Sequence, residues 1–482
     1  MKYKILSIAI AMILVVSIIL SITVSSLIDS KAPRYHQHLE AEEKAVCNDH
    51  GDDVFCSHLP VISIDAGGVA IPGKAYYDEE GNRHYTTTAD GGTYVSANIE
   101  IIDNMGTMNH LDDKKSVSAT ANVRVRGYSS RYFIKLGYAL TFVDDMGANE
   151  PHEIMGMSSH HDWVMHGPIL DKTLIRNYMC YNIAGEIMDY APNVRFCEAF
   201  VNGEYMGLYL MVESITAGDN CRLQLSVNKK QNTFTGYCLR VDRGGDEIKT
   251  MNTFSMYTYQ NPTIVDSVYP GRTNLTPSLK EAIQNDFSAF ERVLYSTDYN
   301  DPKYGYPSMI DVNSFIDYFI FNEFASNYDA GMYSTYIYKE VGGPYRLCVW
   351  DFNSAYDNYQ EYALNPEMFY MQNGVWYRQL FKDGAFTEAL ISRYHELRQT
   401  YLNEEYLQRY IDETVVYLGD ALDRNFERWD DAFIYNLLIP VERNPASYEE
   451  ALGDLKHYIH IRGEWMDENI DTLRQYIVDP KE

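Results

Sequence analysis

The chain is 482 residues long and 46% hydrophobic, and its 68 acidic side chains outnumber 40 basic ones, giving a formal net charge of −28. This length can bury a core large enough for two or three lobes. The acidic balance excludes a general nucleic-acid-binding protein, because such proteins present a basic surface to the phosphates.

The N-terminal segment is apolar and uncharged from residue 5 to residue 28, and Lys2 and Lys4 precede it. About 20 apolar residues suffice for a helix to cross a bilayer. We therefore predict a transmembrane signal anchor over residues 1–28, with the bulk of the chain extracytoplasmic because flanking lysines stay inside. A cleaved signal peptide is the alternative, and it would make the protein secreted. A polar stalk follows over residues 29–58.

The seven cysteines divide by their surroundings. Cys47 and Cys56 flank a polar segment beyond the anchor, and in an exported chain they are the best disulfide candidates. Cys221 with Cys238 is a weaker candidate pair. Cysteines in apolar surroundings are expected to be buried thiols, and these are Cys180, Cys197, Cys238 and Cys348. The sequence contains no CxxC motif, so it does not predict a zinc site of that type.

The first part of the folded chain is predicted to be rich in strands. Residues 59–65 and 94–103 have strand character, with glycine pairs as turns, and a polar loop is expected over 105–118. Residues 121–142 predict a hairpin, because apolar and charged side chains alternate on both sides of a Gly-Tyr-Ser-Ser turn.

Three cations gather around this turn: Arg126, Arg131 and Lys135. Cations and hydroxyls beside a glycine turn suit a polyphosphate ligand. The alternative is a solvated hairpin tip.

A helix is predicted over residues 171–188, and a hairpin with an Asn-Gly turn over 195–213. A strand follows over 237–242, and the polar stretch 244–276 is expected to be a surface insertion. Four histidines crowd the segment before the helix: His152, His160, His161 and His166. Their spacing fits no ligand pattern, so a loop is favoured there over a metal site.

The central stretch, residues 327–359, contains two candidate catalytic carboxylates, Asp329 and Asp351. Asp329 opens the turn that follows a predicted helix over 311–325. Two strands joined by a Gly-Gly-Pro turn separate Asp329 from Asp351. Antiparallel pairing returns the two ends of such a hairpin to the same place, so both carboxylates can face one site. Taken singly, each aspartate also fits a plain turn residue.

The remaining chain is predicted to be helical. Helices are expected over 278–295, 386–400 and 403–428, and a capping box at Ser447 and Glu450 starts a last helix that reaches about residue 476.

Five segments together resemble the spore coat protein CotH family of atypical protein kinases, over roughly residues 59–476. They are RVRGYSSRYFIKLGY, LDKTLIRNYMCYNIA, FVNGEYMGLYLMVESI, NYDAGMYSTYIYK and VWDFNSAYDN. The resemblance implies a two-lobed α+β kinase-like fold, with a β-rich N-lobe over 59–215 and a helical C-lobe over 216–482. It also implies transfer of the ATP γ-phosphate, with Mg²⁺ or Mn²⁺, to a hydroxyl of a surface or coat protein.

The resemblance also implies roles for single residues. Asp329 matches the catalytic aspartate and Asp351 the metal-binding aspartate. Lys135 matches the nucleotide-contacting lysine, with Arg126 and Arg131 in the segment beside it. Two further nucleotide-site candidates are carboxylates: Glu186 as the ion-pair partner of Lys135, and Glu213 at the hinge between the lobes.

Two positions depart from the family pattern. Ser334 stands where many members have a metal-binding Asn, and Asn353 stands where many have Asp. Both remain oxygen donors and so remain candidate metal ligands, with weaker metal binding expected. The departures keep a second reading open, a pseudokinase that serves as a coat or surface scaffold. A third reading is an anchored adhesin that uses its 42 tyrosines.

Overall fold

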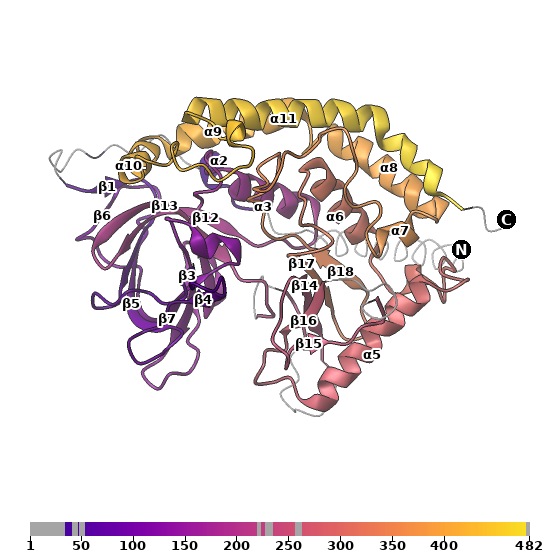
Figure 1. Ribbon diagram of the computed structural model, residues 1–482, viewed down its shortest axis with the longest axis horizontal. Coiled ribbons are helices and arrows are strands. Elements are labelled where there is room, and N and C mark those ends of the chain that lie inside the picture. The colour runs from indigo at the N-terminus through magenta and orange to yellow at the C-terminus, as the bar shows by residue number, and fades with distance from the viewer. Residues whose placement is uncertain are drawn as a thin grey trace, which may run out of the picture. The chain divides into compact units, whose positions relative to one another are not determined.

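The computed structural model describes residues 34–40, 47, 54–218, 223–226, 235–255 and 263–478. It is a mixed α+β structure (Figure 1), which confirms the predicted class. Within the described residues no helix is both long and apolar enough to cross a membrane. The predicted anchor over 1–28 lies outside those residues, as does most of the predicted stalk. The two-lobed kinase-like arrangement stays a prediction.

Seven strands form a closed barrel in the order β11-β13-β12-β2-β5-β7-β8. All neighbouring strands are antiparallel except β2 and β12, which run parallel. The strand bounds are β2 Val61–Asp65, β5 Val95–Ile102, β7 Val117–Arg126, β8 Gly137–Val143, β11 Asp162–His166, β12 Val194–Val201 and β13 Glu204–Glu213. Alternate residues such as Ala121, Val123 and Val125 of β7 are buried in the barrel core, as period-two alternation predicts.

A second, five-stranded sheet has the order β15-β16-β14-β17-β18. Its strands are β14 Tyr237–Asp242, β15 Thr250–Met251, β16 Ile264–Tyr269, β17 Thr335–Lys339 and β18 Tyr345–Cys348. The predicted hairpin of the central stretch is therefore confirmed as β17 and β18. The expected surface insertion over 244–276 is wrong in part, because β15 and β16 of this sheet lie within it and bury Met251 and Val265.

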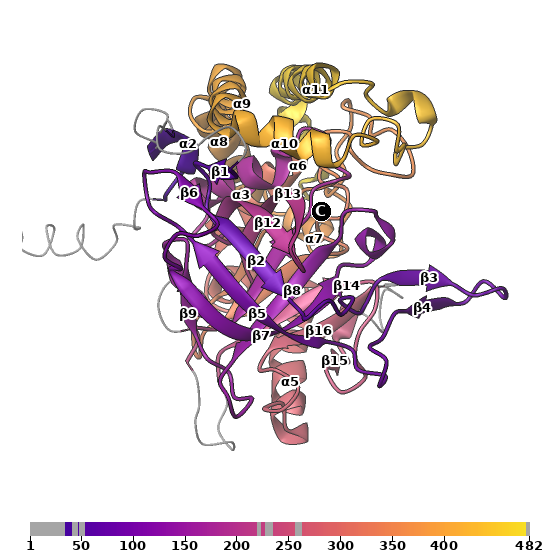
Figure 2. The ribbon, with the colours of Figure 1, turned by 90° about the vertical axis from the view of Figure 1, so that its left-hand side faces the viewer.

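Three two-stranded sheets complete the strands: β1 Cys56–Ser57 with β6 Asn109–His110, β3 Ala75–Tyr77 with β4 Arg83–Tyr85, and β9 His152–Ile154 with β10 Met157–His160. Figure 2 shows the β3–β4 hairpin extending away from the barrel. The loop expected over 105–118 thus contains β6 and the start of β7. The histidine segment is likewise built from strands β9, β10 and β11, and the predicted loop there is wrong.

The helices gather mainly in the second half of the chain (Figure 1). They are α2 Gln37–Glu40, α3 Arg176–Ile187, α5 Pro277–Leu294, α6 Val312–Phe324, α7 Tyr377–Leu380, α8 Gly384–Arg398, α9 Glu404–Leu418, α10 Asp420–Arg428 and α11 Tyr448–Asn469. Short 3₁₀ segments are η1 Ser129–Tyr132, η2 Tyr306–Ser308, η3 Val441–Arg443 and η4 Ile470–Tyr476. The buried apolar side chains of α3 and of α5 to α11 share one large core with the second sheet.

Local chemistry explains most helix boundaries. Asp311 caps α6 and Ser447 caps α11, each by accepting the backbone N–H three residues on, as their sequences predict. The helix predicted over 403–428 is instead divided into α9 and α10, because Gly419 adopts φ of 44°. The helix predicted from residue 171 begins at Arg176, because the Asp171 carboxylate accepts the N–H groups of Thr173 and Arg176 in a preceding turn.

Candidate active site

The two candidate acids meet where the β17–β18 hairpin begins and ends. Asp329 opens a helical turn after α6, and Asp351 follows β18 by three residues. Asn327 connects the two segments, because its Nδ2 donates to the Asp351 carbonyl at 3.3 Å. The charge of Asp351 contributes to raising the pKa of Asp329. The hairpin therefore links the segment of Asp329 to that of Asp351, and a catalytic site shared by the two carboxylates stays a prediction.

Asp351 is held in an uncommon backbone conformation. Its φ is 61°, its N–H donates to the Tyr181 hydroxyl at 3.1 Å, and its Oδ1 accepts Asn353 Nδ2 at 2.7 Å. Burial raises the pKa of the Asp351 carboxyl, while the Arg126 guanidinium and the Asn353 amides lower it. Oδ2 accepts no hydrogen bond from the described residues, so it is free to bind an added cation.

Asp329 is paired with an arginine that the sequence analysis did not select. Arg243 donates from Nη2 to Asp329 Oδ1 at 2.7 Å and from Nη1 to Oδ2 at 3.4 Å, and it lies 3.6 Å from the centre of the Tyr333 ring. Burial raises the pKa of Asp329 and Arg243 lowers it. A bidentate arginine fixes the orientation of a carboxylate as well as its charge.

A third carboxylate, Asp242, also faces the site. Its charge contributes to raising the pKa values of both Asp329 and Asp351. Asp242 ends β14, and its Oδ1 accepts the N–H of Arg243 at 2.8 Å. The sequence contained one signal for these two residues. The predicted strand over 237–242 ends at Asp242, and Arg243 and two glycines follow, which places two charges at a strand end. The Oδ2 of Asp242 lies 3.3 Å from Nε of Arg240. Carboxylate oxygens are the ligands that hard divalent cations prefer, so Asp242 is a further candidate ligand.

Arg126 is the member of the predicted basic cluster whose charge acts on Asp351. It ends β7, lies 5.5 Å from the Trp350 ring, and lowers the pKa of Asp351. Arg131 instead serves the loop, since its Nε donates to the Gly127 carbonyl at 2.7 Å and its guanidinium covers the Tyr85 ring.

Lys135 lies just before β8 rather than within a strand, and it is 1% exposed. Its Nζ donates to the Leu208 carbonyl at 2.5 Å and to Asn425 Oδ1 of α10 at 2.7 Å, and burial lowers its pKa well below the usual value. Contact of Lys135 with a nucleotide remains a prediction, and in this structure the ammonium group is already engaged by protein oxygens.

The expected ion pair between Lys135 and Glu186 is not formed, and that prediction is corrected. Glu186, near the end of α3, lies 3.0 Å from His36 Nε2. Glu213 is fully buried, and its Oε2 accepts Asn193 N and Nδ2 while its Oε1 has no hydrogen-bond partner among the described residues. These two glutamates therefore have surroundings different from those of Asp329 and Asp351.

Ser334 and Asn353, the two residues that depart from the family pattern, differ in their contacts. Ser334 is half-buried and adopts φ of 49° in the turn after Asp329. Asn353 donates to Asp351 through Nδ2, while its Oδ1 accepts Asn177 Nδ2 at 2.9 Å. Asn353 therefore positions Asp351 here, and its amide oxygen is engaged by Asn177, while metal binding by Asn353 and Ser334 stays a prediction.

The start of α3 anchors the loop that carries Asp351. Asn177 Oδ1 accepts the Phe352 N–H at 2.8 Å, and its Nδ2 donates to Asn353 and lies 3.0 Å from His166 Nε2. Arg176 Nε donates to the Ala355 carbonyl at 3.0 Å, and its Nη1 pairs with Asp171 at 2.6 Å. Residues 170–177 thus hold the segment 351–353, which carries Asp351, in place.

Replacing Asn177 by Ala is expected to destabilise the protein and to weaken the site. The change leaves the buried Phe352 N–H without its acceptor, a loss of about 1–3 kcal/mol in the free energy of unfolding. Urea unfolding measures this loss, and Asn98→Ala, at an exposed position of β5, is the matched control. Equal unfolding free energies for the two variants would show that Asn177 does not hold the loop.

Strained backbone is concentrated around these acids. Among the described residues, five of the nine non-glycine residues with positive φ are Ser326, Ser334, Asp351, Tyr356 and Asp357. Such conformations cost roughly 1–3 kcal/mol each and cluster at functional sites. The segment from 326 to 357 therefore has the backbone signature of an active site.

A comparison with protein families gives a match to the model described as CotH kinase protein, over residues 123–466. The match covers more than two thirds of the chain and includes Arg126, Asp242, Arg243, Asp329 and Asp351. This chain belongs to the CotH kinase family. The CotH assignment confirms the resemblance seen in the five sequence segments. A comparison with curated proteins finds no match.

Proposed function

We propose that this CotH-family protein is an ATP- and divalent-metal-dependent protein kinase that transfers the γ-phosphate to a protein hydroxyl. The observation that carries the proposal is the link between the two ends of one hairpin: Asn327, two residues before Asp329, donates to the Asp351 carbonyl, and the charge of Asp351 acts on Asp329. Protein kinases likewise separate the acid that acts on the acceptor hydroxyl from the acid that binds the metal.

The donor set fits a divalent cation. Asp351 Oδ2 and the carboxylate of Asp242 offer the hard oxygen ligands that Mg²⁺ and Mn²⁺ prefer. Burial is the main cause that raises the pKa values of Asp329 and Asp351, neighbouring carboxylates add to it, and a bound cation would offset both effects. When bound, Mg²⁺ or Mn²⁺ supplies neutralisation of the phosphate oxygens.

The protein residues then have separate tasks. Asp329 accepts the proton of the acceptor hydroxyl or orients that hydroxyl, and Arg243 fixes the direction of its carboxylate. Arg126 supplies a fixed positive charge beside Asp351, suited to an ATP phosphate. Asn353 and Asn177 keep Asp351 in its strained conformation.

The location and substrate belong to the same proposal. The apolar segment 5–28 with its flanking lysines supports a single-pass membrane protein whose kinase domain is extracytoplasmic. The substrate would then be a surface or coat protein.

A pseudokinase scaffold is the second candidate function. One observation favours it: Arg243 donates to both oxygens of Asp329, so an acceptor hydroxyl would have to share these oxygens with the guanidinium. Titration of the full-length chain with ATP and Mg²⁺ or Mn²⁺, followed by a transfer assay, separates the two. A kinase binds ATP and transfers its γ-phosphate to protein, whereas a scaffold binds ATP without transferring phosphate.

Arg243→Gln is expected to move the acidic limb of the pH–rate profile to higher pH. Asp329 must be ionised to receive a proton, and Arg243 lowers the pKa that burial raises. Without the guanidinium the pKa of Asp329 rises further, so activity is lost at a higher pH on acidification. Transfer rates measured across pH test this shift, with the exposed Arg272→Gln as control. Superimposable profiles would remove Arg243 from the mechanism.

A further inference from the structure

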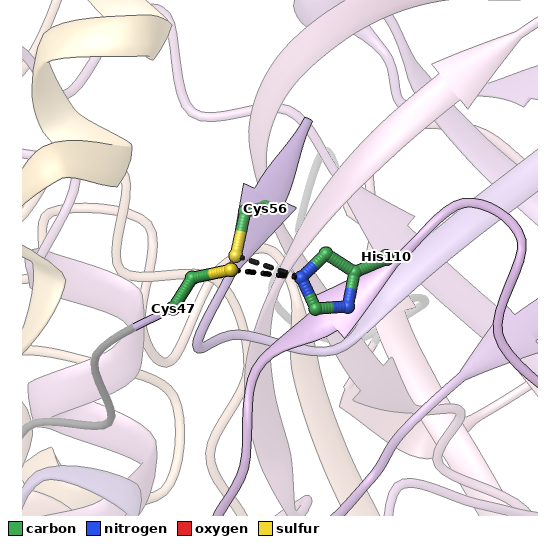
Figure 3. Close-up of side chains that lie close together, drawn as sticks. All are labelled: Cys47, Cys56 and His110. Atoms are coloured by element: carbon green, nitrogen blue, oxygen red, sulfur yellow. Dashed lines mark hydrogen bonds between the residues drawn. The ribbon is translucent and has the colours of Figure 1, made fainter. Parts of the chain in front are cut away.

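A cluster of two cysteines and one histidine lies at the paired strands β1 and β6 (Figure 3). Cys47 Sγ lies 3.3 Å and Cys56 Sγ 3.1 Å from the same atom, His110 Nε2. The three ligand atoms all lie within 4.8 Å of one another. Neither cysteine is part of a disulfide in this structure, so the disulfide expected between them is not formed.

The strand pairing builds this cluster. Cys56 and His110 are directly opposite each other in the antiparallel β1–β6 register, where facing side chains approach closely. Asn109 is 1% exposed, and its Nδ2 donates to the carbonyls of Ser57 and Leu59 at 3.3 and 2.9 Å. These contacts fix the segment that carries His110 against the segment that carries Cys56.

The other face of His110 is held by a carboxylate. Asp113 Oδ2 accepts the His110 N–H at 2.8 Å and lies 3.3 Å from His110 Nδ1. Asn104 Nδ2 donates to the same oxygen at 2.7 Å. A proton on Nδ1 facing Asp113 leaves the lone pair of Nε2 directed at the two sulfurs. Metal-binding histidines in proteins are commonly oriented by a carboxylate in this way.

We propose that Cys47, Cys56 and His110 form a site for a soft divalent cation, with Zn²⁺ as the expected occupant and Asp113 as a positioning residue. Two thiolates and an imidazole are a typical ligand set for zinc, and a fourth position is left for water. Tetrahedral geometry with Zn–S and Zn–N bonds of about 2.3 and 2.0 Å separates sulfur from nitrogen by about 3.5 Å. The observed 3.1 and 3.3 Å require an expansion of only a few tenths of an ångström.

A metal at this place would crosslink residue 47 to the β1–β6 sheet. The site uses none of the residues assigned to phosphoryl transfer, so it neither depends on the proposed kinase function nor tests it. The same sulfurs could instead be oxidised to a disulfide, which would leave His110 without a metal to bind. The metal and disulfide forms exclude each other, so one experiment distinguishes them.

The test is metal analysis of the full-length protein, purified without chelator or reductant, together with thiol counting. The expected result is about one zinc per chain, with Cys47 and Cys56 protected from thiol reagents until a chelator is added. Substituting Co²⁺ for zinc should give the absorption bands of a tetrahedral thiolate site. Cys56→Ser and His110→Gln should each abolish zinc retention, and Asp113→Asn should weaken zinc affinity about 10–100-fold.

Two controls share the chemistry of these residues but lie outside the cluster. His84→Gln removes a histidine that also faces a carboxylate, Asp78 at 2.6 Å, and Asp112→Asn changes the exposed neighbour of Asp113. Both should retain zinc. A Cys47–Cys56 disulfide in the purified protein, or zinc affinity unchanged by His110→Gln, would overturn the proposal.

Discussion

Asp351→Asn should abolish metal-dependent nucleotide binding and phosphoryl transfer together. The change removes the charge that holds the cation while keeping the shape of the side chain, so transfer should fall by at least ~10³-fold. The fold should survive, because the new amide oxygen can still accept the hydrogen bond from Asn353 Nδ2. Calorimetric titration with ATP, with and without Mg²⁺, measures nucleotide binding, and a transfer assay measures the rate of phosphoryl transfer.

The matched control for this variant is Asp145→Asn. Asp145 is an exposed aspartate in the turn after β8, so its replacement makes the same change in charge away from the site. It should bind Mg·ATP as the parent does. Parent-like nucleotide binding by Asp351→Asn would exclude Asp351 as the metal ligand.

Asp329→Asn should instead preserve Mg·ATP binding while transfer falls. A group that accepts or orients a proton typically contributes about 10²–10⁴-fold to the rate, and the fall should lie in that range. Arg243 keeps an acceptor in the amide oxygen, so its position should hold. Single-turnover transfer and nucleotide titration on the same preparation separate the two effects.

Comparison of Asp351→Asn with Asp329→Asn tests whether the two acids have different tasks. If both lose nucleotide binding equally, Asp329 also binds the metal, and the division of tasks is wrong. If both transfer phosphate at the parent rate, the hairpin is not the catalytic element.

Local sequence predicts those parts of the structure that local interactions decide. The β17–β18 hairpin follows from its turn residues and strand propensities, and its pairing then places Asp329 and Asp351 together. The caps at Asp311 and Ser447 are similarly local. The same reasoning treated residues 171–188 as one helix, because periodicity does not reveal that the Asp171 side chain competes for the first backbone N–H groups.

Contacts between distant segments could not be predicted in this way. Arg243 reaches Asp329 across 86 positions, and Lys135 reaches Asn425 across 290. No periodicity or turn signal encodes such a partner, so Arg243 was missed and Lys135 was assigned to an ion pair that it does not make. Cys47 and Cys56 were expected to form a disulfide, which the structure does not contain, and their neighbour His110 comes from another strand 54 positions after Cys56.

The central claim is that the acids of this hairpin catalyse transfer of the γ-phosphate of ATP. It is tested most directly with ATP labelled at the γ-phosphate or at the α-phosphate. The full-length chain is incubated with Mn²⁺ or Mg²⁺ and with γ-labelled or α-labelled ATP, beside Asp351→Asn and Asp145→Asn. The account predicts that label enters protein from the γ-position only, in the parent and in Asp145→Asn but not in Asp351→Asn. Protein labelled from the α-position, or a parent that binds Mg·ATP yet transfers no label to itself or to surface proteins, would contradict it.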